Sequence, residues 1–194
     1  MRRQNGYTVL EVLIAIAIMA LVSSMAMVSG TRLITTMRTS KTAASVSDSI
    51  ALARSMAVAR TAAWQVRFIP DGTTPGLFRS FQLESNSYEW VGCSGTPPCL
   101  GASWTIETSL MRNHQPWQTE PGTGLFIPGA TGEVTLVFDR NGRRLGGVDT
   151  QMRVCTLLSQ VDGTQACIPD SEANYCIRSG SGIIRPMGSG ATCP

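Results

Sequence analysis

The sequence predicts an α+β protein in which one long N-terminal helix, membrane-spanning in its first half, packs on the antiparallel β-sheet of a globular domain. Two observations carry this prediction. Residues 7–62 of the 194-residue chain contain no proline, and apolar side chains recur at helical spacing from Ala43 to Ala57. From residue 63 onward, short segments alternate apolar and polar side chains and are separated by turns rich in glycine and proline. A single helix followed only by strands is expected to cover one face of the sheet.

The helix begins with an apolar segment, residues 7–29, whose only charged side chain is Glu11. A helix of about 22 residues is about 33 Å long, which matches a hydrocarbon core of about 30 Å. Arg2 and Arg3 precede the segment and favour an N-terminus in the cytoplasm. A charge inside a membrane helix costs roughly 2.5–3.5 kcal/mol. Glu11 is therefore expected to pair with a group outside its own helix.

Residues 30–62 are predicted to continue the helix on the periplasmic side of the membrane. Apolar side chains recur there at helical spacing, with serine, aspartate and arginine on the other faces. The stripe consists of Ala43, Val46, Ile50, Ala53 and Ala57. Because most of these side chains are small, a sheet can approach the helix closely.

Residues 63–194 are predicted to form the β-rich domain. The first alternating segment is AWQVRFI, and the later ones are LFRSFQLE, SYEWVG, SWTIE, GLFIP, EVTLVFD, QMRVCTLL, YCIRSG and GIIRPM. The turn PDGTTPG and the Asn-Gly dipeptide of DRNGRR separate some of them, which is typical of antiparallel hairpins.

All six cysteines lie in this domain, and none has the paired C-x-x-C spacing of a zinc site. An even number of cysteines in a part of the chain expected outside the cytoplasm indicates disulfides, formed in an oxidising compartment such as the periplasm. Cys93 and Cys99 flank the turn-forming SGTPP and are the simplest local pair. The pairs predicted next are Cys155–Cys167 and Cys176–Cys193.

The sequence argues against an enzyme. His114 is the only histidine, so a multi-histidine metal site cannot form. The serines lack a nucleophile elbow or a Ser-x-x-Lys context, and the sequence contains no Walker A or dinucleotide-binding motif. We therefore predict no catalytic residue, no metal and no cofactor.

The stretch RRQNG followed by YTVLEVLIAIAIMALV resembles the class III leader of type IV pilins and pseudopilins. The resemblance implies a leader over residues 1–6, cleavage after Gly6 by a prepilin peptidase, and N-methylation of Tyr7, which stands where the family usually has phenylalanine. It also implies that Glu11 pairs with the N-terminal amine of a neighbouring subunit, so that each charge offsets the desolvation of the other. The expected location is the inner membrane, with the C-terminal domain in the periplasm, and then a pilus or pseudopilus.

Two further stretches narrow the resemblance to the H-type pilins, the FimT/GspH group. They are DSIALARSMAVARTAAWQVRF, where the helix meets the first strand, and VTLVFDRNGRRLGG, with its Phe-x-x-x-Gly-Arg hairpin. The resemblance implies a pilin fold and a minor pilin, FimT- or FimU-like, that takes part in pilus assembly or initiation with other major and minor pilins. The alternative is the H-type pseudopilin of a type II secretion system, which has the same anchor, helix and sheet.

The FimT branch also suggests double-stranded DNA as a partner, taken up in natural transformation. That branch carries a C-terminal Gly-Arg-x-Arg motif whose arginines meet phosphates. Here GSGIIRP supplies Gly182 and Arg185, with Ile183 in place of the first arginine. Phosphate binding needs several cations on one face. The candidate contacts are Arg143, Arg144, Arg178 and Arg185.

Overall fold

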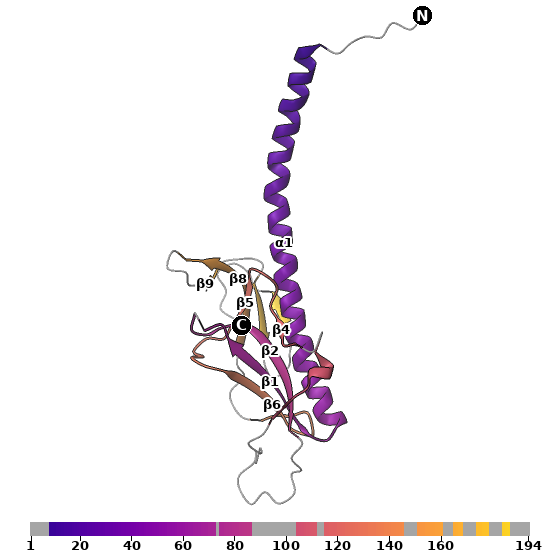
Figure 1. Ribbon diagram of the computed structural model, residues 1–194, viewed down its shortest axis with the longest axis vertical. Helices are drawn as coiled ribbons and strands as arrows, with labels where there is room; N and C mark the ends of the chain where they lie inside the picture. The colour runs from indigo at the N-terminus through magenta and orange to yellow at the C-terminus, as the bar shows by residue number, and fades with distance from the viewer. Residues whose placement is uncertain are drawn as a thin grey trace, which may run out of the picture. The chain divides into compact units, whose positions relative to one another are not determined.

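The computed structural model has the predicted fold class, one N-terminal helix followed by an antiparallel sheet (Figure 1). The chain divides into two compact units, Met1–Met37 and Arg38–Pro194, and the helix α1 (Val9–Ala59) contributes to both. The structure describes residues 8–72, 74–86, 104–111, 115–145, 151–160, 165–168, 174–178 and 184–186.

The C-terminal end of α1 is a Schellman motif. The N–H of Ala62 donates to the carbonyl of Ala57 (3.3 Å), and the N–H of Thr61 donates to the carbonyl of Val58 (3.4 Å). Thr61 has a φ of 50°, in the left-handed region that this ending requires and that glycine usually supplies. The chain therefore reverses within a few residues and enters the first strand, β1 (Ala63–Pro70).

From residue 38 onward, α1 buries one stripe of side chains against the sheet. The stripe is the one predicted from helical spacing, and each member is at most 2% exposed: Ala43, Val46, Ile50, Ala53 and Ala57. Alternate residues of β1, namely Trp64, Val66 and Phe68, are fully buried in the same core. Each large apolar side chain buried in this way contributes about 1.5–3 kcal/mol to stability. Figure 1 shows the second half of α1 running along the sheet.

The sheet is antiparallel throughout, and its main path runs in the order β11-β10-β8-β5-β2-β1-β6-β7. Three short strands lie off this path, where β3 and β4 pair with β2 and β9 pairs with β8. A single 3₁₀ turn, η1 (Thr108–Leu110), follows β3. The strands after β1 are β2 (Leu77–Asn86), β3 (Thr105–Ile106), β4 (Trp117–Gln118), β5 (Thr123–Phe126), β6 (Val134–Phe138), β7 (Arg144–Leu145), β8 (Gln151–Ser159), β9 (Gln165–Cys167), β10 (Tyr175–Arg178) and β11 (Ile184–Pro186).

The sheet face away from α1 carries a buried polar cluster. Glu84 of β2 is 2% exposed, and its carboxylate accepts hydrogen bonds from Gln82 (2.6 Å), Arg67 (3.3 Å) and Gln65. The Arg67 guanidinium also binds the exposed Glu133 through both carboxylate oxygens, at 2.6–3.0 Å. The hydrogen bonds that Arg67 donates to Glu133, more than the one that it donates to Glu84, raise the pKa of Arg67 above its ordinary value, while burial acts in the opposite direction. The Arg67 guanidinium thus forms ion pairs with two carboxylates, those of Glu84 and Glu133.

Most predicted strands are present, and the ones that the sequence missed are short. The alternating segments from AWQVRFI to GIIRPM correspond to β1, β2, β3, β5, β6, β8, β10 and β11. The segment SYEWVG lies outside the described residues. Sequence periodicity did not predict β4, β7 and β9, which have two or three residues each.

Candidate assembly site

The N-terminal end of α1 is a capping box formed by Thr8 and Glu11. The Thr8 N–H and the Thr8 hydroxyl donate to the same carboxylate oxygen, Oε2 of Glu11, at 3.0 and 3.1 Å. In return, the Glu11 N–H donates to the Thr8 hydroxyl at 3.3 Å. This reciprocal pattern satisfies N–H groups that the first turn of a helix leaves without partners. Its sequence signal is the Thr-x-x-Glu of TVLE, which the periodicity argument overlooked.

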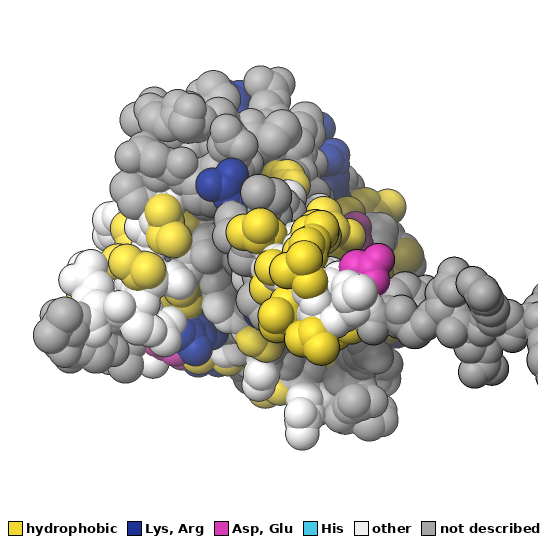
Figure 2. All heavy atoms as spheres, turned by 90° about the horizontal axis from the view of Figure 1, so that it is seen from above, with side chains coloured by type: hydrophobic (Ala, Val, Ile, Leu, Met, Phe, Trp, Pro, Cys, Tyr) yellow, Lys and Arg dark blue, Asp and Glu magenta, His cyan; other side chains and the backbone are white. Residues whose placement is uncertain are grey.

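The first turns of α1 are apolar on every side. From Val9 to Val22 the large apolar side chains are 49–78% exposed. Figure 2 shows hydrophobic side chains gathered over this end of the helix. Gly6 and Tyr7, the predicted cleavage and methylation positions, lie outside the described residues.

Among the described residues, none of the helices combines the length and the apolarity that a bilayer crossing requires.

The disulfide predicted between Cys155 and Cys167 is present, with 5.5 Å between the two Cα atoms. It joins β8 to β9, so the short hairpin is covalently closed at its base. Cys176 is also disulfide-bonded, while its predicted partner, Cys193, lies outside the described residues. Cys93 and Cys99, the other predicted pair, also lie outside them.

Two of the predicted DNA-contacting arginines lie on neighbouring strands. Arg178 stands opposite Gln151 in the β10–β8 pair, and Arg185 of β11 stands opposite Cys176 of β10. Arg153 of β8 stands opposite the same Cys176 from the other side. Sequence reasoning missed Arg153, whose signal was its place between the apolar Met152 and Val154 in QMRVCTLL.

The other two predicted arginines lie elsewhere in the sheet. Arg143 and Arg144 belong to the β6–β7 turn and to β7, which ends the strand order opposite to β11. The turn itself is as predicted, since Gly142 of the Asn-Gly dipeptide has a φ of 70°. The four arginines therefore occupy two regions, at opposite ends of the strand order.

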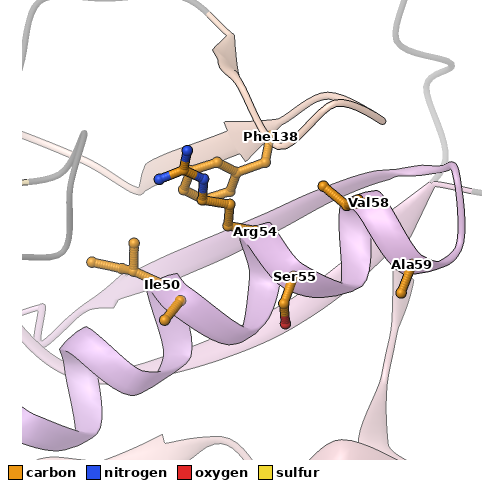
Figure 3. Close-up of a pocket in the computed structure, with 7 residues that line it drawn as sticks. Ile50, Arg54, Ser55, Val58, Ala59 and Phe138 are labelled. Atoms are coloured by element: carbon orange, nitrogen blue, oxygen red, sulfur yellow. The ribbon is translucent and has the colours of Figure 1, made fainter.

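An apolar groove of about 470 Å³ lies between the last turns of α1 and Phe138 of β6. In Figure 3 the side chains of Arg54 and Val58 extend toward Phe138 of β6. A Cβ at Gly142 would lie 3.0 Å from the Cγ2 of Val58, so the β6–β7 turn packs closely against the last turns of α1.

Within the part of the chain that the structure describes, no three histidine, cysteine, aspartate or glutamate side chains come together as metal ligands. His114 lies outside that part.

Residues 1–27 match the family model of the prokaryotic N-terminal methylation motif. Thr8 and Glu11, which form the capping box, lie within this motif. Two solved structures resemble it, both crystal structures of the type IV minor pilin FimU of Pseudomonas aeruginosa. Each is 14% identical in sequence; they cover 78% of this chain and 90% and 94% of their own, with TM-scores of 0.41 and 0.38. No curated protein matches the sequence.

Proposed function

We propose that this pilin-like chain is a minor type IV pilin, anchored in the inner membrane by residues 7–29, that takes part in pilus assembly or initiation. The observation that carries the proposal is the methylation motif, which covers both the predicted cleavage position and Glu11. The domain after the anchor lies in the periplasm, where its cysteines are oxidised. Prepilin peptidase and other pilins are its partners.

Glu11 is the residue on which assembly depends in this proposal. Its carboxylate sits at the first turn of α1, where the Thr8 N–H and hydroxyl orient it. A neighbouring subunit that brings its N-terminal ammonium to this carboxylate gives each buried charge a counter-ion. Either charge buried alone would cost several kcal/mol, so pairing favours the assembled state over separate subunits.

The test of the proposal is the entry of variants into filaments. We expect Glu11→Ala to reach the membrane fraction at the wild-type level, because it makes the anchor more apolar, and to be missing from sheared filaments. The matched control is Asp48→Ala, which removes an exposed carboxylate farther along α1 and should be incorporated normally. Filaments that contain Glu11→Ala in wild-type amounts would overturn the assembly role.

The H-type pseudopilin of a type II secretion system shares the anchor, the helix and the sheet, and so it remains the alternative. Deletion of the gene separates the two. If the chain is a minor pilin, the deletion strain should lose surface pili and keep secretion. If it is a pseudopilin, the deletion strain should keep its pili and accumulate secreted enzymes in the periplasm.

Binding of double-stranded DNA is the second function that we propose. It is supported by the register that sets Arg178 and Arg185 on adjacent strands, with Arg153 on the next strand. Contacts of guanidinium groups with phosphates release counterions and have no sequence preference. DNA taken up in natural transformation would be bound in this way.

A further inference from the structure

A polar recess of about 290 Å³ lies between α1 and the segment around β4. Six of its lining side chains carry the argument below, and they come from two parts of the chain far apart in sequence. They are Lys41 and Ser45 of α1, and Gln115, Trp117, Gln118 and Glu120 around β4. The volume lies just below the usual range for ligand sites, about 300–1,000 Å³, so an occupant would be a small molecule.

The walls of the recess are fixed by contacts beneath it. The hydroxyl of the buried Thr42 accepts a hydrogen bond from the Glu120 N–H (3.1 Å) and is also hydrogen-bonded to the hydroxyl of Thr123 (2.9 Å). The Trp117 ring stacks on Phe81, with ring centroids 5.6 Å apart. The segment that carries Glu120 is thus held against α1 before any ligand arrives, which reduces the entropy lost on binding.

Two residues of opposite charge, Lys41 and Glu120, line this recess. Lys41 is the only lysine in the chain. Across the described part of the chain, neither the Lys41 ammonium nor the Glu120 carboxylate forms an ion pair, with each other or with any third group. Among the described residues, Glu120 forms its hydrogen bonds through backbone atoms, as donor to Thr42 and as acceptor from Thr123.

Three neutral polar side chains that line the recess also form no hydrogen bonds within the described part of the chain. In the described structure, the hydroxyl of Ser45 and the side-chain amides of Gln115 and Gln118 have no hydrogen-bond partner. Amides that both donate and accept suit the peptide group of a ligand. The recess therefore presents a cation, an anion and amides around one small volume.

We infer that this recess binds a small zwitterion, an amino acid or a dipeptide, whose carboxylate meets Lys41 and whose ammonium meets Glu120. A ligand with both charges can form an ion pair with Lys41 and another with Glu120. A ligand with one charge pairs with only one of these residues and leaves the other in contact with water. Charge-assisted hydrogen bonds at the two ends set the orientation, and the amides meet the peptide group between them. This site is separate from the N-terminal site and does not depend on filament assembly.

The test measures binding of alanylalanine to the full-length chain in detergent micelles by isothermal titration calorimetry. We expect wild-type protein to bind alanylalanine about tenfold more tightly than either the N-acetylated or the C-amidated dipeptide. Lys41→Met should weaken binding of alanylalanine about tenfold and leave binding of the amide unchanged. Glu120→Gln should show the reverse pattern, with binding of the N-acetyl form unchanged.

The matched control is Arg54→Met, which removes an exposed cation of α1 outside the recess and should bind like the wild type. Lys41→Arg, which keeps the positive charge, should retain most of the affinity. Absence of alanylalanine binding by the wild type would overturn the inference. So would equal binding of the free and blocked dipeptides, or equal losses in Lys41→Met and Arg54→Met.

Discussion

The backbone N–H and the hydroxyl of Thr8 both bind the carboxylate of Glu11, at 3.0 and 3.1 Å, in the first turn of α1. The charged side chain proposed to meet a neighbouring subunit is therefore already held by its own helix end. In this arrangement, Thr8 orients Glu11 before assembly.

Loss of this cap should loosen the N-terminal end of the helix. Replacing an N-cap threonine with alanine typically costs about 1 kcal/mol, so Thr8→Ala should speed amide exchange in the first turn of α1. Hydrogen exchange measured by mass spectrometry in micelles would show it. Thr8→Ser keeps the hydroxyl and should exchange like the wild type. Equal exchange in all three proteins would mean that the cap contributes nothing to the helix end.

Processing of the leader should leave Tyr7 as the first residue of the mature chain. We expect mass spectrometry of the protein from filaments or membranes to find an N-terminus at Tyr7 with one added methyl group. A Gly6 variant with a bulky side chain should stay unprocessed, because the peptidase must approach the backbone at this position. A mature N-terminus elsewhere would contradict the proposed leader.

Gly124 of β5 should be sensitive to an added side chain. A Cβ at this position would lie 2.6 Å from the Cδ1 of Leu77 and 3.0 Å from the Cδ2 of Leu157. Overpacking of this kind costs typically about 1–3 kcal/mol, so Gly124→Ala should lower the free energy of unfolding by that amount in a denaturant titration. Gly132→Ala is the control, since a Cβ there meets nothing within 4 Å.

The two ion pairs of Arg67, with Glu84 and with Glu133, should contribute unequally to stability. Glu133 is exposed, so Glu133→Ala should cost less than about 1 kcal/mol. Arg67→Ala should cost clearly more, because it leaves Glu84, which is 2% exposed, without a counter-ion. Thermal unfolding of both variants measures the difference. An equal cost would show that Gln65 and Gln82 alone satisfy the buried carboxylate.

The two arginine regions should differ in their effect on DNA binding. Fluorescence anisotropy with a labelled duplex at several salt concentrations should show that Arg178→Ala and Arg185→Ala each weaken binding and lower the salt slope by about 1. The matched control is Arg143→Ala, which removes a cation at the other end of the strand order. It should change the DNA affinity and the salt slope less than the other two substitutions do. No binding of the wild type at low salt would contradict the proposed contact with DNA.

Periodicity predicted the parts of this fold that repeat. The stripe from Ala43 to Ala57 and the alternation of β1 are both visible in the sequence, because one face of each element is buried. The Cys155–Cys167 pair, 12 residues apart, was one of several local pairings that the sequence allowed. Strands of two or three residues, such as β4 and β7, are too short to show a period.

Other features depended on contacts that the pattern cannot encode. Gln65 and Glu84 occupy the alternate positions that usually face water, yet both are buried. Lys41 and Glu120 meet at one recess only because the fold brings α1 beside β4. The capping box was the exception, since Thr8 and Glu11 carry a local signal that hydropathy alone does not register.

The central place of β1 has a mechanical consequence. β1 follows α1 directly, and it pairs with β2 from Ala63 to Pro70 on one edge and with β6 from Trp64 to Phe68 on the other. Tension applied along α1 would reach the sheet through β1. It would act as a shear force on the β1–β2 and β1–β6 pairs, so that many hydrogen bonds bear the force at the same time. An edge strand such as β7 would peel away bond by bond under the same force. Single-molecule pulling on the helix should therefore meet its main resistance at β1.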